Sequence, residues 1–304
     1  IGGVNSAFLA GVISAVGTLF LVLATYATQL RSRKTLALIS WAIIILLFFF
    51  QNVINVDLKR VPVGKNPNKE LTAYLKEGGK IIDTRWSAFG RTDVFELNSV
   101  RDKKFIFIDG PAGSVMYQFN ETFRDDGDSV HQLRYSSAYF PFYFGNTDKV
   151  LIIGPGDGKD ILIALIGGGK DITGVEVNRR TVEIMEDYSS FNGHLYTKYP
   201  NVHIIVDEGR NYLKRSRIKY DLIILNIPVT LTSQGVNGYS LVENFLLTTD
   251  SFKDYINHLE EDGRLVIVTH NIVHIYKLVT TALRVLDCLN EYSIGIMEHI
   301  AVVA

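Results

Sequence analysis

A glycine-rich turn between a predicted strand and a predicted helix constrains the fold of this chain more than any other feature. Residues 150–158 read VLIIGPGDG, and a helix is predicted over residues 160–166. Glycines permit positive φ angles and let a ligand approach the backbone closely. Glu176 follows Gly156 by 20 residues and ends the next predicted strand. A carboxylate at that place can accept hydrogen bonds from both ribose hydroxyls, so the pattern predicts a nucleoside site.

The second half of the chain alternates predicted strands and helices. The strands cover residues 149–153, 172–177, 203–206, 220–225, 264–269 and 293–303, and the helices cover residues 160–166, 179–188, 211–215, 249–259 and 272–289. Strands joined by helices form parallel sheets that are covered on both faces. We therefore expect residues 146–304 to form an α/β, Rossmann-like, doubly wound parallel sheet of the class I methyltransferase kind, the nucleoside-binding domain.

Two long uncharged runs occupy the N-terminal part, over residues 7–26 and 35–56, with basic residues at 31, 33 and 34 between them. Each run is long enough to cross a bilayer as a helix, so residues 1–60 are predicted to form a transmembrane hairpin. A hairpin buried in a protein core is the alternative. Because the chain begins with isoleucine and ends within a predicted strand, we expect it to be truncated at both ends, with further membrane helices preceding it.

The predicted nucleoside site determines on which side of the membrane the residues after 60 are expected to lie. The basic turn and the lysines and arginine after residue 57 give opposite orientations under the positive-inside rule. A site for a cytoplasmic metabolite decides the matter, so we expect a multi-pass integral membrane protein with its soluble part in the cytoplasm. Residues 61–145 are predicted to form a linker and a small β-rich subdomain, with strands over residues 86–94, 104–109 and 115–120.

The charge balance and the cysteine content exclude several function classes. Lys and Arg total 31 and Asp and Glu total 32, a net charge of −1, which gives no support for a nucleic-acid partner. A single cysteine excludes an internal disulfide framework and a multi-cysteine zinc site. His131, His194 and His203 show no metal-ligand spacing, so no metal site is expected.

Two further acidic positions belong to the predicted nucleoside site. Asp207 and Glu208 follow the third strand, where a carboxylate can accept a hydrogen bond from an adenine amino group; acids at a helix N-terminus are the alternative. Asp157 lies within the glycine turn. An acid there attracts a bare ammonium tail and repels a carboxylate, unless Asp157 only caps the following helix.

The runs VLIIGPGDGKDILIAL, ITGVEVN and FNGHLYTKYPNVHIIVDEGRNYL resemble the spermidine synthase family of Rossmann-like aminopropyltransferases, and most closely its bacterial branch fused to membrane helices. The resemblance is specific from residue 149 to residue 268. It implies that the wall around an adenosyl sulfur donor, decarboxylated S-adenosylmethionine, is formed by Gly154, Gly156 and Gly158. It further implies that Asp157 holds the aminopropyl ammonium, Glu176 the ribose, and Asp207 or Glu208 the adenine, with Glu208 favoured by the glycine alignment. By resemblance alone, a homodimer is expected.

The chain departs from the family at the position of the catalytic base. There the family has an aspartate that deprotonates the attacking amine, and this chain has Asn226. An amide has no useful basicity near neutral pH. Glu243 is the candidate for a substitute base, and a loop or helix-start acid is the alternative interpretation.

Three functions remain open from the sequence. The first is a membrane-anchored aminopropyltransferase, which needs no prosthetic group and uses decarboxylated S-adenosylmethionine and an amine acceptor. The second is a methyltransferase that uses intact S-adenosylmethionine, with Lys159 facing the methionine carboxylate. The third is a catalytically silent nucleoside-binding membrane scaffold. Asn226 favours the third, whereas the glycine loop and Glu176 favour the first two.

Overall fold

The computed structural model describes residues 70–110, 112–121, 130–226, 245–269, 272–289 and 300–302, with isolated residues between 11 and 20. Within these residues, no helix has both the length and the apolar character needed to cross a membrane. The two predicted membrane segments lie almost entirely outside the described residues. Glu243 and most of the last predicted strand also lie outside them.

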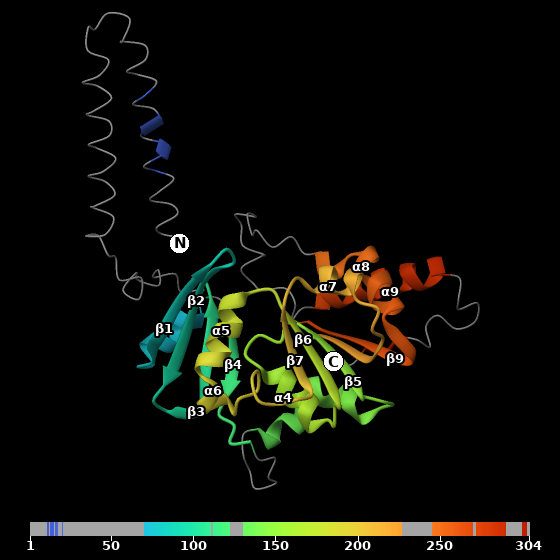
Figure 1. Cartoon of the computed structure of the whole chain (residues 1–304), viewed down its shortest axis with the longest axis horizontal. Coiled ribbons are helices and arrows are strands. Elements are labelled where there is room, and N and C mark those ends of the chain that lie inside the picture. Colours follow the sequence, from blue (N-terminus) through green and yellow to red (C-terminus); the bar gives the residue numbers. More distant parts are fainter. Residues whose placement is uncertain are drawn as a thin grey trace, which may run out of the picture.

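A small antiparallel sheet forms the first layer (Figure 1). It follows a short helix, and its strands are hydrogen-bonded in the order β1-β2-β3-β4. The elements are α3 (Glu70–Lys76), β1 (Lys80–Ser87), β2 (Gly90–Leu97), β3 (Val100–Ile108) and β4 (Ala112–Tyr117).

The strand predicted over residues 86–94 is wrong, because the chain reverses direction within it. Ser87 ends β1 and pairs with Gly90, the first residue of β2, so residues 88 and 89 form the turn. Gly90 has a φ of +121°, a conformation that L-residues rarely adopt. The prediction missed the hairpin because the turn carries none of the usual Asn-Gly or Asp-Gly signals.

A five-stranded parallel sheet forms the second part of the fold. Its strands are ordered β7-β6-β5-β8-β9, and every neighbouring pair is parallel. The strands are β5 (Lys149–Ile153), β6 (Asp171–Glu176), β7 (Val202–Val206), β8 (Tyr220–Asn226) and β9 (Leu259–Val268). This order is that of a doubly wound sheet, so the predicted Rossmann-like α/β class is confirmed for this part of the chain.

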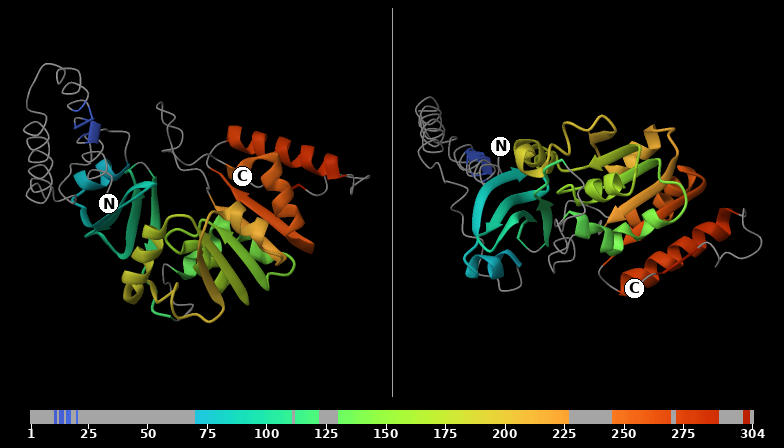
Figure 2. Two further views of the ribbon diagram at one scale, coloured as in Figure 1. Left: turned by 45° about the horizontal axis from the view of Figure 1, so that its top comes forward. Right: turned by 90° about the horizontal axis from the view of Figure 1, so that it is seen from below.

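Helices cover both faces of the parallel sheet (Figures 1 and 2). They are α4 (Lys159–Ile166), α5 (Arg179–Asp187), α6 (Ser189–Asn192), α7 (Gly209–Arg215), α8 (Thr249–Asn257) and α9 (Ile272–Leu289), and short 3-10 turns lie at His131–Tyr135, Ser137–Tyr143 and Phe245–Leu247. Alternate residues of a strand point to opposite faces. Val150 and Ile152 therefore pack with α4, while Leu151 and Ile153 pack with α7 and α8.

The predicted boundary between the helix over residues 249–259 and the following strand is also wrong. The helix α8 ends at Asn257 and β9 begins at Leu259, so the acidic residues 260–262 belong to the strand and not to a connection before it. The register with β8 shifts between Tyr220 and Leu222. Gly263 lies at this irregularity, where an added Cβ would lie 2.8 Å from the Tyr220 carbonyl oxygen.

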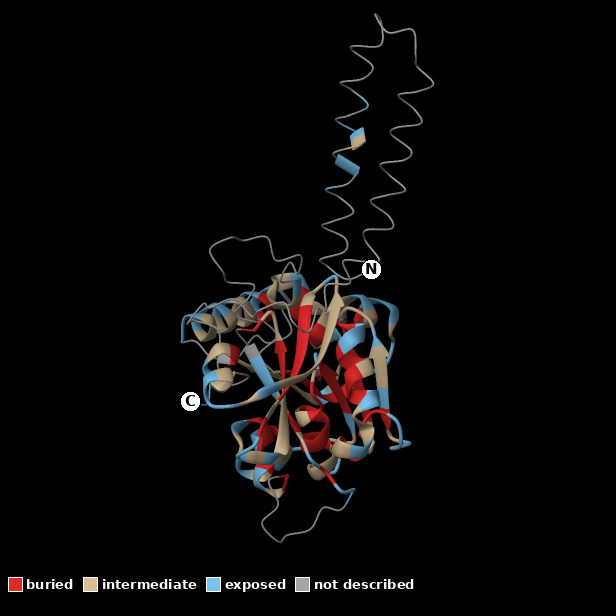
Figure 3. Cartoon of the chain, turned by 90° about the vertical axis from the view of Figure 1, so that its left-hand side faces the viewer, coloured by how far each residue is buried: buried red, intermediate tan, exposed pale blue. Residues whose placement is uncertain are grey.

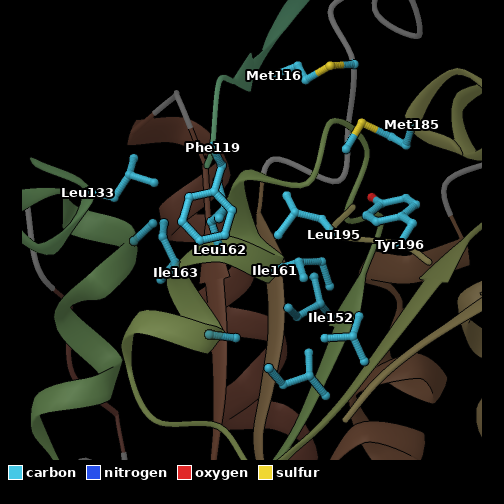
Figure 4. Close-up of a cluster of buried hydrophobic side chains, with 14 of the residues drawn as sticks. Met116, Phe119, Leu133, Ile152, Ile161, Leu162, Ile163, Met185, Leu195 and Tyr196 are labelled. Carbon is cyan, nitrogen blue, oxygen red and sulfur yellow. The ribbon is translucent and has the colours of Figure 1, made fainter. Parts of the chain in front are cut away.

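One continuous apolar core joins the two sheets. Met116 of β4 is fully buried and belongs to the same cluster as Ile161 of α4 and Met185 of α5 (Figure 4). Buried segments, coloured red in Figure 3, run through the interior of the described part of the chain. The helices α5 and α6 lie between the small sheet and the parallel sheet (Figure 2). This packing fixes the position of β4 relative to the glycine turn.

Candidate functional site

The topology brings those predicted site residues that the structure describes to one edge of the parallel sheet. The chain leaves β5 toward β6 on one side, and β8 lies on the other side of β5, so the order reverses between β5 and β8. Ligands of open α/β sheets bind beyond the carboxyl ends of the strands at such a point. Gly154 follows β5 there, Glu176 ends β6, Asp207 follows β7 and Asn226 ends β8.

The glycine turn needs its glycines for two different reasons. The φ angles of Gly154, Gly156 and Gly158 are +75°, +52° and +85°. An added Cβ at Gly154 would meet nothing within 4 Å, so that side of the turn is open for a ligand. At Gly158 it would lie 2.7 Å from the Met185 Cε, so this glycine also permits close packing. Gly158 is the N-cap residue of α4.

Glu176 ties the glycine turn to the end of β6. One carboxylate oxygen accepts the backbone N–H of Gly156 at 3.1 Å, and the other accepts that of Asn178 at 2.8 Å. The side chain is buried, and this burial raises the pKa of Glu176 although both backbone N–H groups favour the charged form. The Val177 backbone N–H also favours the charged form, and the carboxylate retains an acceptor position for a ribose hydroxyl.

Asp157 is a buried acid with one unused oxygen. Its side chain is 5% exposed, and Oδ1 accepts the backbone N–H of Lys159 at 3.2 Å. Oδ2 is buried and has no hydrogen bond of normal geometry to the described residues, although the Ser114 hydroxyl is near enough to favour the charged form of the carboxyl. Burial raises the pKa of Asp157 to about 7, with a further increase from Asp160, while the Lys159 N–H and the Ser114 hydroxyl oppose the shift. A buried, unsatisfied carboxylate is costly, and a bound cation would relieve that cost.

The two acids after β7 are already engaged. Glu208 is the N-cap of α7, where its carboxylate accepts the backbone N–H groups of Arg210 at 3.0 Å and Asn211 at 2.8 Å. Asp207 accepts the Glu208 backbone N–H at 2.9 Å and pairs with Arg215. The Asp207 backbone N–H donates to the Glu176 carbonyl at 3.1 Å, which places the pair beside the end of β6. Carboxylate oxygens retain capacity for an adenine amino group, so the adenine assignment stays a prediction.

Asn226, at the position where the family has its base, donates a hydrogen bond. Its Nδ2 lies 2.8 Å from Oδ1 of Asp160, in the first turn of α4. Asp160 is 6% exposed, and burial raises its pKa, whereas Asn226 and Lys159 favour the charged form. A carboxylate therefore lies next to the end of β8. The sequence interpretation missed Asp160 because spacing along the chain does not indicate the contact between α4 and β8.

Two tyrosines also belong to this site and were not predicted. The Tyr196 hydroxyl donates to the Gly156 carbonyl at 2.9 Å, and burial, together with Glu176, Asp157 and Asp160, raises the Tyr196 pKa well above its usual value. Burial and the charge of Asp157 raise the pKa of Tyr117, which ends β4. The small sheet thus borders Asp157. Tyr196 lies within residues 191–213, one of the segments that resemble the spermidine synthase family. That resemblance was the only feature of the sequence that pointed to Tyr196.

No group of three or more His, Cys, Asp or Glu side chains that could hold a metal ion occurs in the part of the chain that the structure describes.

Comparisons with known proteins point to one group of enzymes. Over 125 residues, the chain is 30% identical to the polyamine aminopropyltransferase of Buchnera aphidicola and 34% identical to that of Pectobacterium atrosepticum, in each case covering 40% of both chains. Over 133 residues it is 27% identical to that of Korarchaeum cryptofilum, covering 44% of this chain and 38% of the relative. The chain thus spans less than half the length of these curated relatives.

A solved structure is also similar. Spermidine synthase from Thermotoga maritima matches with a TM-score of 0.49 and 20% identity, covering 68% of this chain and 64% of that one. No protein-family model matches the chain. The sequence relatives confirm the resemblance to the spermidine synthase family over the matched part of the chain.

Proposed function

We propose that this protein transfers an aminopropyl group from decarboxylated S-adenosylmethionine to an amine acceptor. The observation that carries the proposal is the buried Oδ2 of Asp157, which has no hydrogen-bond partner among the described residues and belongs to a glycine turn that is open at Gly154. A donor that ends in a bare ammonium would supply the missing hydrogen bond and the opposite charge. The names of the relatives, polyamine aminopropyltransferases, support the same reaction class.

The other residues of the edge would hold the adenosyl part. Gly154 and Gly156 form the backbone wall, Glu176 takes the ribose hydroxyls, and Asp207 or Glu208 takes the adenine amino group. The protein needs no prosthetic group in this proposal, because the sulfonium of the donor already activates the carbon that is attacked. The tasks left to the chain are to orient the two substrates and to keep the attacking amine unprotonated.

The finer parts of the proposal concern the membrane and the domains. Residues 1–60 would anchor the enzyme to a lipid bilayer, supported by the length and the lack of charge of residues 7–26 and 35–56. Residues 61–145 would form the linker and the small sheet, and residues 146–304 the nucleoside-binding domain. Both parts would lie in the cytoplasm, and the protein would form a homodimer. Retention of the full chain in membranes washed with carbonate tests the anchor, and release into the wash would contradict it.

A product assay tests the reaction. The full chain is incubated with decarboxylated S-adenosylmethionine and a panel of primary amines, and release of methylthioadenosine is followed. The expected result is release that depends on an amine and is lost in Glu176→Gln. Release of S-adenosylhomocysteine from intact S-adenosylmethionine, without reaction of the decarboxylated donor, would identify a methyltransferase instead. Absence of both products would leave a nucleoside-binding scaffold.

A further inference from the structure

The carboxylate next to the end of β8 comes from α4 rather than from β8 itself. Asn226 is the last residue of β8, and its amide nitrogen lies 2.8 Å from the Asp160 carboxylate. Asp160 is 6% exposed, so this carboxylate is fixed in a nearly dry environment at the point where the strand order reverses. An amide cannot take a proton from an amine, but it can orient a carboxylate that does.

The surroundings of Asp160 favour a cationic ligand. Asp157, three residues earlier, has a buried oxygen without a partner among the described residues, and the charge of Asp160 adds to the rise of the Asp157 pKa. Lys159 favours the charged form of Asp160. The negative charges of Asp160 and Asp157 also raise the pKa of Tyr196. Two adjacent buried carboxylates suit the two amines that aminopropyl transfer brings together, the donor tail and the attacking acceptor.

We propose that Asp160 is the catalytic residue that binds the acceptor's attacking amine and takes its proton, with Asn226 as the positioning residue that holds the Asp160 carboxylate. This inference rests on the proposed transfer reaction. It concerns the acceptor side of the site, whereas the donor assignment depends on Asp157 and Glu176.

The proposed step balances as follows in atoms and charge. The acceptor arrives as a primary ammonium, and one N–H proton passes to the Asp160 carboxylate, which leaves a lone pair on nitrogen. That lone pair forms the new C–N bond while the C–S bond breaks, and its electron pair stays on sulfur in neutral methylthioadenosine. The product leaves as a secondary ammonium, and the proton on Asp160 passes to solvent.

Amide and carboxylate exchange tests this assignment in the full chain. Asp160→Asn removes the charge with little change of shape, and the double variant Asp160→Asn with Asn226→Asp returns a carboxylate to β8. The control is Asp171→Asn, at the opposite end of the sheet, where Asp171 pairs with His203. Four quantities are measured for each variant: kcat of the transfer, the melting temperature, the affinity for methylthioadenosine, and the affinity for 1,4-diaminobutane with methylthioadenosine present.

The expected result separates the two substrates. In Asp160→Asn we expect kcat and diamine affinity to fall about 100-fold, methylthioadenosine affinity to stay within about threefold, and the double variant to regain about tenfold. Asp171→Asn should match the unmodified protein. Unchanged diamine affinity in Asp160→Asn, or equal loss of methylthioadenosine affinity, would overturn the inference. If the unmodified protein binds the diamine through Asp160 but transfers nothing, the proposed reaction fails while this binding role stands.

Discussion

At the amino edge of the parallel sheet, Asp221 accepts the Lys149 backbone N–H at 2.7 Å and the Asn146 amide at 3.0 Å. At the carboxyl edge, Asp157 keeps a buried oxygen without a partner among the described residues. Both acids are at most 9% exposed. A buried acid whose oxygens are satisfied stabilises the fold, whereas a buried acid with a free oxygen destabilises it until a ligand binds. On the function that we propose, the contrast separates a structural edge from the edge that binds the donor.

The largest expected effect comes from Asp157→Asn. Donor affinity and transfer should fall about 100-fold, since the donor ammonium loses its carboxylate. The unliganded protein should become more stable at about pH 8, by as much as ~4 kcal/mol, because the pKa of Asp157 is about 7 in the folded state and 3.8 in the reference state. Kinetics and chemical denaturation measure the two effects.

The size of that stability gain depends on pH. Because the folded-state pKa lies above the unfolded value, ionisation of Asp157 weakens the fold as the pH rises from about 4 to about 7. The variant and the unmodified protein should therefore be equally stable below about pH 4. A gain of the same size at low pH would show that relief of a buried charge is not its cause.

The second prediction compares two glycines of the same turn. Gly158→Ala should destabilise the fold by about 3 kcal/mol, because it combines a positive φ with a Met185 contact at 2.7 Å. Gly154→Ala should cost only about 1 kcal/mol, since its Cβ would point into open space, yet it should weaken donor binding. Denaturation midpoints and calorimetry distinguish them, and equal stability losses would contradict the assignment.

The third prediction tests the amino edge. Asp221→Asn should lower the free energy of unfolding by about 2 kcal/mol. The new amide has an NH2 group in place of one oxygen, and this donor must face another donor, either the Lys149 N–H or the Asn146 NH2. Donor affinity should stay unchanged, because Asp221 begins β8 and the site lies at the other end. Thermal unfolding and calorimetry check both parts. A marked fall in donor affinity would remove the distinction between the edges.

The smallest expected effect is a pH dependence of donor binding. Below about pH 7 the carboxyl of Asp157 is protonated and cannot pair with an ammonium. Affinity for decarboxylated S-adenosylmethionine should therefore rise about tenfold between pH 6 and pH 8 and then level off. Methylthioadenosine, which lacks the ammonium, should show no such rise. Parallel curves for the two ligands would count against the role of Asp157.

The sequence indicated the carboxyl edge well because its signals are local. Residues 150–158 and Glu176 lie in a strand, turn and helix pattern that predicted the parallel sheet and the position of the site. Asp160 and Asn226 are 66 residues apart and meet only because β5 and β8 are neighbours. The hairpin between β1 and β2 was missed because residues 88 and 89 carry no turn signal. Contacts that depend on tertiary structure, including that of Tyr196 with Gly156, produce no regular spacing of residues in the sequence, so the sequence does not predict them.

The central claim is that the carboxyl edge binds an adenosyl ligand and that Asp157 selects its tail. Calorimetry of the full chain with methylthioadenosine and with S-adenosylhomocysteine tests it most directly, because the two ligands differ chiefly in the charged tail. The account predicts tighter binding of methylthioadenosine, since a carboxylate beside Asp157 would be repelled. Tighter binding of S-adenosylhomocysteine, or binding of neither ligand, would contradict it.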